Sequence, residues 1–294
     1  MTLPASGAIS LNQVNVELTL AGTTSINMNQ ASVRSLFGVA SGQISMSDGY
    51  GKSSQFAFAI ASTQTNANLR TLAVNAGWNQ TSNVLATINS GVYITANGTG
   101  SPALTINGTF PNGIELVNNG TIVGRGGNGG AGGASNGGAL YGGSNGASGG
   151  LALTISVAAS IRNNGTIAGG GGGGKGGAGS RYVTRAPTKN DPNTYYSQRG
   201  GGGGGGGRSS LTNSSGGGGG GASGGVAPYG NNVAGSAGGT GTSSGQGGGG
   251  SPNGNSGGAW GAGGGGGGSS GGAATSGQAN VTWLATGTRY GSIG

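Results

Sequence analysis

The sequence predicts a mostly β and irregular fold in three parts: a small N-terminal repeat module, a β-rich middle domain, and a C-terminal polyglycine II helical bundle with variable loops. Two observations lead to this prediction. Of the 294 residues, 79 are glycine and only 32% are hydrophobic, which argues against one large conventional core. The apolar residues also concentrate in 1–123, 151–168 and 279–293, whereas most of 124–278 is Gly with Ser, Asn and Ala.

Residues 1–55 contain a degenerate repeat. The units ISLNQVNVEL, INMNQASVRSL and ISMSDGYGKS begin at Ile9, Ile26 and Ile44, with spacings of 17 and 18 residues. Each unit opens with an apolar, polar, apolar triplet typical of a short strand. Units this small cannot bury a face alone, so we expect them to pack on each other or on a partner. The segment is predicted to be a docking module, and a purely structural N-terminal cap is the alternative.

Residues 56–123 are predicted to form a β-rich domain with one short helix. FAFAI, starting at Phe56, alternates large residues with alanines, which suits a strand whose second face is closely packed. The segment 66–78 has apolar residues at helical spacing, with Asn66 or Asn68 as N-cap and Gly77 as the end. VLATI, GVYIT, ALTI and GIELV follow as short strands, and Trp78 is expected in the core.

A second repeat links this domain to the glycine-rich region. ALTI occurs at Ala103 and Ala152, and NNGTI occurs at Asn118 and Asn163, each time ahead of a glycine tract. This regularity indicates that the glycine tracts start from defined anchors.

Residues 124–294 are predicted to be the glycine-rich domain. Several tracts place their only larger residue at every third position, as in GGNGGAGGA from Gly126, which matches a helix with three residues per turn. Neighbouring helices of this kind can satisfy each other's backbone groups. A flexible linker is the alternative, because ordering glycine is costly. The strand-like segment from Ala279 favours an array that is pinned at its end.

In such a bundle, the segments between tracts become loops at its ends. Tyr and Arg on a rigid scaffold are typical of interface hot spots. The alternative for each aromatic residue is packing against the side of the bundle. The candidate contact residues on these loops are Tyr141, Arg181, Tyr182, Arg185, Tyr195, Tyr196, Leu211, Tyr229 and Trp260.

The formal charge of +8 comes from 12 Lys and Arg against four acids. It favours acidic partners such as phosphorylated polysaccharide, anionic lipid headgroups or nucleic acid, although so few charges can also leave an imbalance by themselves.

Catalytic chemistry is not expected. The chain has no His and no Cys, so the usual general base, thiol nucleophile and zinc ligands are missing. GYGKSS lacks the first glycine of a phosphate-binding loop, since Met46 stands there. We therefore expect no catalytic residue, no metal, no cofactor and no enzyme activity.

The ends and hydropathy of the chain bear on where it is made. There is no run of about 18 apolar residues to insert into a membrane. The N-terminal MTLPASGAIS lacks the features of a signal peptide, so we expect synthesis in the cytoplasm of the cell.

Several segments resemble a known group of proteins. NNGTIAGGGGGGKGG and the alternation of glycine tracts with Tyr-bearing segments resemble the receptor-recognising adhesins at the tips of long tail fibres in T-even-like bacteriophages. SGAISLNQVNVEL, SVRSLFGVASGQISMSDGYGKS and VTWLATGTRYG are similar to segments of phage tail proteins. The resemblance covers most of the chain, whereas residues 56–117 depart from the attachment domain of these adhesins.

The resemblance implies a polyglycine II sandwich whose loops bind a host outer-membrane protein or lipopolysaccharide, without catalysis. It also implies that residues 1–55 attach to a tail fibre or tail tip protein, and that the chain sits at the distal tip of the tail or tail fibre in the virion. A structural or ice-binding polyglycine bundle is the alternative function, and it would need a flat, regular face. A glycine-rich nucleic-acid binder fits the charge but lacks repeated Arg-Gly-Gly boxes, so no nucleic acid partner is expected. A monomeric cap and a trimeric assembly both stay open at this point.

Overall fold

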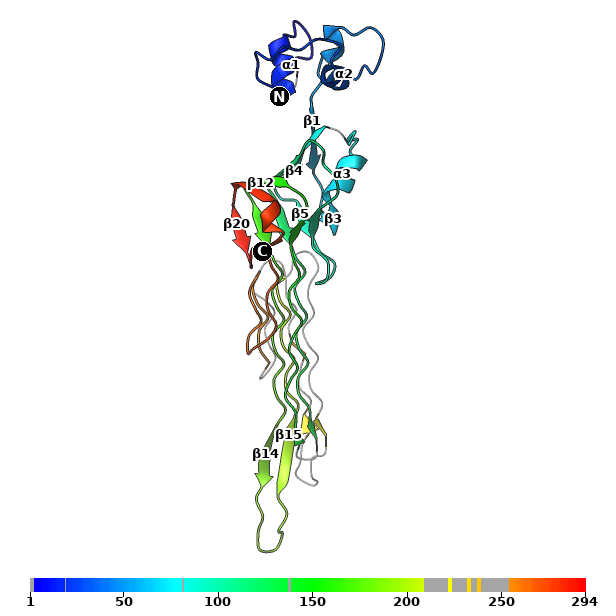
Figure 1. Ribbon diagram of the computed structural model, residues 1–294. Coiled ribbons are helices and arrows are strands. Elements are labelled where there is room, and N and C mark those ends of the chain that lie inside the picture. Colours follow the sequence, from blue (N-terminus) through cyan, green and yellow to red (C-terminus); the bar gives the residue numbers. More distant parts are fainter. Residues whose placement is uncertain are drawn as a thin grey trace.

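The computed structural model describes residues 3–18, 20–80, 82–136, 139–208, 222–223, 232–233, 237–238 and 254–294. For a few strand residues, namely 136, 182, 184, 195–198, 222–223 and 232–233, it describes the backbone alone. The molecule is elongated, with a helical N-terminal module at one end, a β-sheet body beside it, and long glycine-rich segments that lead to a hairpin at the far end (Figure 1). The C-terminus lies at the β-sheet body.

The N-terminal module is built from short helices. These are α1 (Leu11–Glu17), α2 (Ala31–Phe37) and the 3-10 helix η1 (Met46–Gly49). The predicted short strands are therefore wrong. Ser10 and Ser45 each form a capping box with the residue three positions later, Gln13 and Asp48, and this pairing starts a helical turn instead. The hydrogen bonds from Ser45, first from its amide, also lower the pKa of the Asp48 carboxyl.

The three repeat units share one small core. Ile9 is buried, and Ile26 and Ile44, the first residues of the other two units, pack against the same cluster. The buried members of this cluster are Leu3, Ile9, Val14, Val33, Leu36 and Phe37. The prediction that the units pack on each other is confirmed, and the repeat spacing marks one contact point per unit.

Three parallel sheets form the body of the molecule. The first contains β1 (Gln55–Ile60), β4 (Asn83–Ile88), β7 (Ile114–Asn118), β12 (Ala159–Asn163) and β19 (Val281–Ala285). The second contains β2 (Gln64–Thr65), β5 (Tyr93–Thr95), β8 (Thr121–Val123), β13 (Thr166–Ala168) and β20 (Thr288–Tyr290). The third contains β3 (Ala67–Asn68), β6 (Leu104–Ile106), β11 (Leu153–Ile155) and β18 (Thr275–Ser276). The chain visits the sheets in this order in each successive coil, so the body is a parallel β-solenoid.

The second sequence repeat corresponds to strands in register on adjacent coils. Residues of the two ALTI segments pair as Leu104 with Leu153 and Ile106 with Ile155, and the two NNGTI segments pair as Asn118 with Asn163. The two buried asparagines form a ladder, in which the Asn118 Nδ2 donates to the Asn163 Oδ1 at 2.8 Å. The Asn163 Nδ2 donates in turn to the Thr286 carbonyl at 2.8 Å, which ties a further coil to the ladder.

A short α-helix, α3 (Leu69–Asn75), lies in the first coils of the solenoid, as the sequence predicts. The Asn68 side chain accepts a hydrogen bond from the Thr71 amide, and Gly77 has a φ of 100°, which favours glycine there. Trp78 is buried, stacks on Phe110 with ring centroids 5.2 Å apart, and donates its Nε1 hydrogen to the Ser82 carbonyl. Both the cap and the core position of Trp78 are confirmed.

Strand β1 differs from expectation on one point. Ala57 and Ala59 are exposed, so the second face of FAFAI is not closely packed. The reason is that only the inner face of a solenoid sheet meets the core, while the outer face meets solvent.

The solenoid core extends across residue 123, where the sequence suggested a domain boundary. Buried residues from the first coils, such as Ile60 and Ile122, belong to one cluster with Ile155, Ile167 and Ala274. The glycine-rich sequence enters this body as two excursions, 124–150 between β8 and β11 and 169–274 between β13 and β18. The C-terminal strands β19 and β20 then complete a last coil by pairing with β12 and β13, next to the 3-10 helix η2 (Gln278–Asn280).

Hydrogen bonds between the glycine tracts recur at every third residue. The amides of Gly171, Gly174 and Gly177 donate to the carbonyls of Arg208, Gly205 and Gly202 at 2.8 to 2.9 Å. The carbonyls of the same three glycines accept from Gly127, Gly130 and Gly133. The amides one position earlier, at Gly170, Gly173 and Gly176, donate to carbonyls of a third neighbouring segment, those of Gly150, Ala147 and Ser144. The tract 169–179 therefore lies inside the array and bonds to neighbours on several sides.

The close approach of these backbones leaves room only for glycine. A Cβ atom on Gly173 would overlap the Asn128 carbonyl oxygen, and one on Gly127 would overlap the Ala147 carbonyl oxygen. The larger residues of the tract 124–134 stand in a different column, where Asn128 and Ala131 are exposed. The period of three in the sequence thus separates the packed positions from the solvent-facing ones.

Two small sheets lie at the far ends of the excursions. One contains β10 (Ala139–Leu140), β9 (Ser135–Asn136) and β16 (Ala222–Ser223), and the other contains β14 (Ser180–Arg185), β15 (Tyr195–Arg199) and β17 (Asn232–Val233). The described part of the chain is thus mostly β and irregular with few helices, which confirms the coarse fold class.

A glycine substitution tests the packing of the array. Gly173→Ala should lower the free energy of unfolding by about 1 to 3 kcal/mol, because a buried methyl group forces the backbones apart. Gly142→Ala is the matched control, since a Cβ there meets no atom within 4 Å, and it should change stability little. Denaturant unfolding of both variants measures the difference, and equal stabilities would contradict the packing.

The asparagine ladder gives a second test. Asn163→Ala should destabilise the protein by about 1 to 3 kcal/mol, because Asn118 and two backbone carbonyls lose a buried partner. Asn164→Ala removes a neighbouring, exposed amide that bonds to Asn119, and it should cost far less. Thermal unfolding of the two variants checks this order, and a reversed order would rule out the ladder as a source of stability.

Candidate functional site

The β14–β15 hairpin projects at the end of the molecule farthest from the N-terminal module (Figure 1). Its strands pair from Ser180 with Arg199 to Arg185 with Tyr195, with a register shift between Val183 and Arg185. β15 also pairs with β17, which joins the hairpin to a later segment of the same excursion. The hairpin is thus held at its base by strand pairing and continues directly from the glycine tract 169–179.

Asp191 organises the tip of this hairpin. Its Oδ2 lies 3.2 Å from an Arg185 Nη1, and its Oδ1 accepts hydrogen bonds from the Asn193 amide and side chain, each at 3.1 Å. Its backbone exchanges hydrogen bonds with Thr188 at 2.7 and 3.2 Å, which closes a turn around Lys189 and Asn190. One carboxylate therefore fixes both sides of the turn, as Asp commonly does.

The β9–β10 hairpin brings a second segment to this end. The Tyr141 backbone bonds to Ala134 and Gly179, while its side chain is 55% exposed. β9 contacts β15, so the two small sheets are neighbours. Tyr141, Arg181 and Arg185 are therefore brought to one end of the array. Leu140 and Val183, which sequence reasoning missed, are also exposed apolar residues here, and their only sequence signal is their position beside Tyr141 and Tyr182.

The remaining candidate residues fall into three groups. Trp260 does not lie at this end. Its ring centroid is 5.9 Å from that of Tyr290, a residue of the last solenoid coil, and 3.6 Å from the Arg208 Cζ. Its contacts match the packing alternative for an aromatic residue. For Tyr182, Tyr195 and Tyr196 the structure gives the backbone in β14 and β15. Leu211 and Tyr229 lie outside the described residues.

Charge is concentrated at the tip. The hairpin 180–199 carries four of the 12 basic residues against one acid, a formal net charge of +3. Residues 134–144 and 209–278 contain no charged side chain. Arg181, Lys189 and Arg199 are exposed, and Arg185 is half-buried against Asp191.

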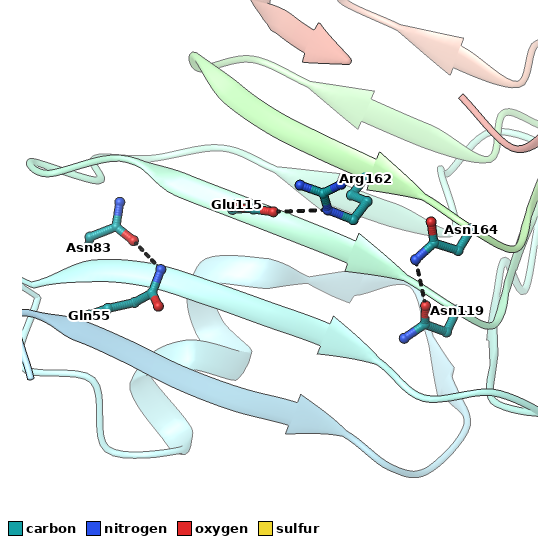
Figure 2. A network of polar contacts seen from close by, with 6 residues as sticks. All are labelled: Gln55, Asn83, Glu115, Asn119, Arg162 and Asn164. Atoms are coloured by element: carbon teal, nitrogen blue, oxygen red, sulfur yellow. Dashed lines mark hydrogen bonds and ion pairs between the residues drawn. The ribbon is translucent and has the colours of Figure 1, made fainter. Parts of the chain in front are cut away.

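The polar pairs of the solenoid link adjacent strands and coils (Figure 2). Gln55 donates to Asn83 at 3.1 Å, Glu115 lies 3.6 Å from Arg162, and Asn164 donates to Asn119 at 2.9 Å. Such cross-strand pairs stabilise a sheet. The solenoid's one carboxylate thus faces a guanidinium, an arrangement that supports strand pairing.

The described residues contain neither a cluster of metal-ligating side chains nor a helix that could span a membrane. None of their His, Cys, Asp and Glu side chains gather in groups of three or more that could hold a metal ion. No helix among them is long and apolar enough to cross a membrane.

The N-terminal module carries a different kind of surface. Leu11, Val16, Leu20 and Tyr50 are 36 to 44% exposed, so apolar area surrounds helix α1. Between this module and the first coils lies a cleft of about 480 Å³, lined by residues that include Val16, Glu17 and Asn83. The buried Glu17 carboxylate accepts hydrogen bonds from the Ser53 hydroxyl and the Ser54 amide, which fixes the module to the start of β1.

Two comparisons with known proteins gave a match, one in sequence and one in fold. Residues 55–190 match the model of the family described as phage tail fibre adhesin Gp38. The match runs from the start of β1 to the hairpin turn, and it includes residues 56–117, which the sequence alone had set apart from such adhesins. No curated protein matches the chain in sequence.

A solved structure shares the fold. A chain in the crystal structure of the gp37–gp38 adhesin tip complex of the bacteriophage S16 long tail fibre matches with a TM-score of 0.54 and 22% sequence identity. The alignment covers 98% of this chain and 99% of the matched chain. The family match over residues 55–190 supports a phage tail fibre adhesin, and the solved structure shows a shared fold.

Proposed function

We propose that the chain is a noncatalytic adhesin at the tip of a phage tail or tail fibre, which recognises a bacterial surface receptor through its distal loops. One observation carries the proposal: the exposed, basic β14–β15 hairpin projects at the end opposite the N-terminal module. A receptor-binding tip and an attachment base at opposite ends are what a fibre-tip protein requires.

The proposed scaffold of the loops is a polyglycine II sandwich. Three residues per turn is the repeat of this type of helix. The hydrogen bonds at every third glycine and the positions with no room for a Cβ support it. The proposed contact residues are the loop residues Tyr141, Arg181, Tyr182, Arg185, Tyr195, Tyr196, Leu211 and Tyr229. Trp260 is less suited to direct contact, because it packs between Arg208 and Tyr290.

Residues 1–55 are proposed to attach the chain to a tail fibre or tail tip protein. The exposed Leu11, Val16 and Leu20 supply apolar area of the kind that protein interfaces bury. The similar S16 chain comes from a complex of two fibre proteins, which is consistent with such a partner.

A structural or ice-binding bundle is the second candidate function. It would need a flat, regular face, whereas the tip carries a projecting hairpin with a net charge of +3. The hairpin therefore favours recognition over surface coating.

Replacement of residues 181–199 by a Gly/Ser linker tests the proposal. The variant should keep the melting temperature of the solenoid and lose adsorption to host cells, because the linker removes the projecting surface and leaves the coils intact. Cell-binding of the purified protein to a strain that the native protein binds is the measurement.

The control replaces the exposed solenoid turn 61–63, Ala-Ser-Thr, by Gly-Ser-Gly, which should leave adsorption unchanged. Normal adsorption of the 181–199 replacement would refute receptor recognition by this hairpin.

A further inference from the structure

We propose that the β14–β15 hairpin binds phosphate groups on a bacterial surface glycan, which makes phosphorylated lipopolysaccharide the receptor. This inference rests on the proposed adhesin function and deepens it by naming the chemistry that the tip recognises.

The first argument is the charge of the tip. All charged side chains of the segments 134–144, 180–199 and 209–253 belong to the hairpin, which has four cations and one carboxylate. That carboxylate, on Asp191, is bound within the hairpin by Arg185 and Asn193. The potential that the tip presents outward is therefore positive, and it attracts an anionic ligand.

The second argument is how the cations are spread. Arg181 and Arg199 lie at the base of the hairpin, where the register pairs them with Gln198 and Ser180, and Lys189 lies in the turn. A strand rises about 3.4 Å per residue, so the cations extend over roughly 20 Å. A ribbon of separated charges suits a ligand with several anionic groups along its length.

The third argument is the type of cation. Three of the four are Arg, whose planar guanidinium matches phosphate in a two-point geometry. The three exposed cations, Arg181, Lys189 and Arg199, lie at the protein surface, where one ion pair contributes little, so affinity requires several contacts at once. A glycan that bears several phosphates supplies such contacts, whereas an isolated acidic side chain on a protein loop supplies one.

The backbone also places three tyrosines on the two strands. Tyr182, Tyr195 and Tyr196 belong to β14 and β15, and tyrosine combines an apolar ring with a hydroxyl group. Sugar rings carry apolar C–H faces and hydroxyl groups, so this composition fits a glycan that holds the phosphates.

The experiment uses the full chain and a bacterial strain that it binds. Lipopolysaccharide purified from that strain is immobilised either intact or after chemical removal of its phosphates, and binding is measured by biolayer interferometry. The native protein should bind the intact material and lose about tenfold or more in affinity on dephosphorylation, because several weak contacts are lost together. Raising the salt concentration should weaken the binding, since exposed charges are screened.

Two triple variants distinguish the effect of the hairpin cations from the effect of the protein's overall charge. Arg181→Gln/Lys189→Gln/Arg199→Gln should reproduce the loss on intact lipopolysaccharide. Lys52→Gln/Arg125→Gln/Arg162→Gln removes the same formal charge from the N-terminal module, the start of the first excursion and the solenoid, and it should bind like the native protein. Equal losses in both variants would overturn the assignment to the hairpin.

Further arms distinguish the sources of phosphate. Vesicles of phosphatidylglycerol test a lipid headgroup, and inorganic phosphate tests a free anion; binding as tight to vesicles as to lipopolysaccharide would overturn the glycan assignment. Unchanged binding after dephosphorylation would overturn phosphate recognition. Absence of binding to intact lipopolysaccharide, with loss of cell-binding after outer-membrane proteins are stripped, would assign the receptor to a protein. In that case the inference fails while the adhesin function stands, whereas cell-binding that survives replacement of 181–199 defeats the proposed function itself.

Discussion

The structure depends on the backbone hydrogen bonds of the glycine tract 169–179. Its amides and carbonyls are bonded to five surrounding segments, at 124–133, 141–150, 202–208, 255–265 and 269–272, and to Tyr290 of β20. Such bonds require backbones to approach so closely that a Cβ at Gly173 would overlap a neighbouring carbonyl. Glycine gives up conformational entropy and buries no side chain, so the ordering cost is offset by many shared backbone bonds and not by a hydrophobic core.

The solenoid supplies the hydrophobic core that the glycine tracts lack. Each excursion leaves from the end of a strand in the second sheet and returns to a strand in the third, so both ends of every excursion are fixed by pairing and by the buried core. The asparagine ladder at Asn118 and Asn163 holds the coils that carry the excursions in register. Burial of apolar side chains thus stabilises the solenoid. Backbone hydrogen bonds then keep the glycine tracts ordered as far as the charged β14–β15 hairpin at their far end.

Much of this arrangement could be predicted from the sequence because the repeats are physical contacts. ALTI and NNGTI recur because their residues stack in register, and Asn68 and Gly77 bound the α3 helix as helix signals do. The prediction of strands in the N-terminal module was wrong because Ser10 and Ser45 cap short helices. The apolar, polar, apolar triplet around each serine alternates like a strand, so it obscures this helix signal. The single solenoid was missed because its coils are separated by more than a hundred residues, as between β13 and β18. The contacts of Trp260 with Tyr290 and Arg208 were also missed, because they join separate segments and leave no trace in the local sequence pattern.

Native-state hydrogen exchange of the peptides covering 169–179 tests the central claim most directly. If the tract is ordered by its backbone bonds, its amides should exchange as slowly as those of the core strand β12, and far more slowly than those of the exposed turn 99–101. Gly173→Ala should then accelerate exchange throughout the tract. Exchange at the rate of an unstructured Gly/Ser linker would contradict the account, because the hairpin would then be tethered and not held in place.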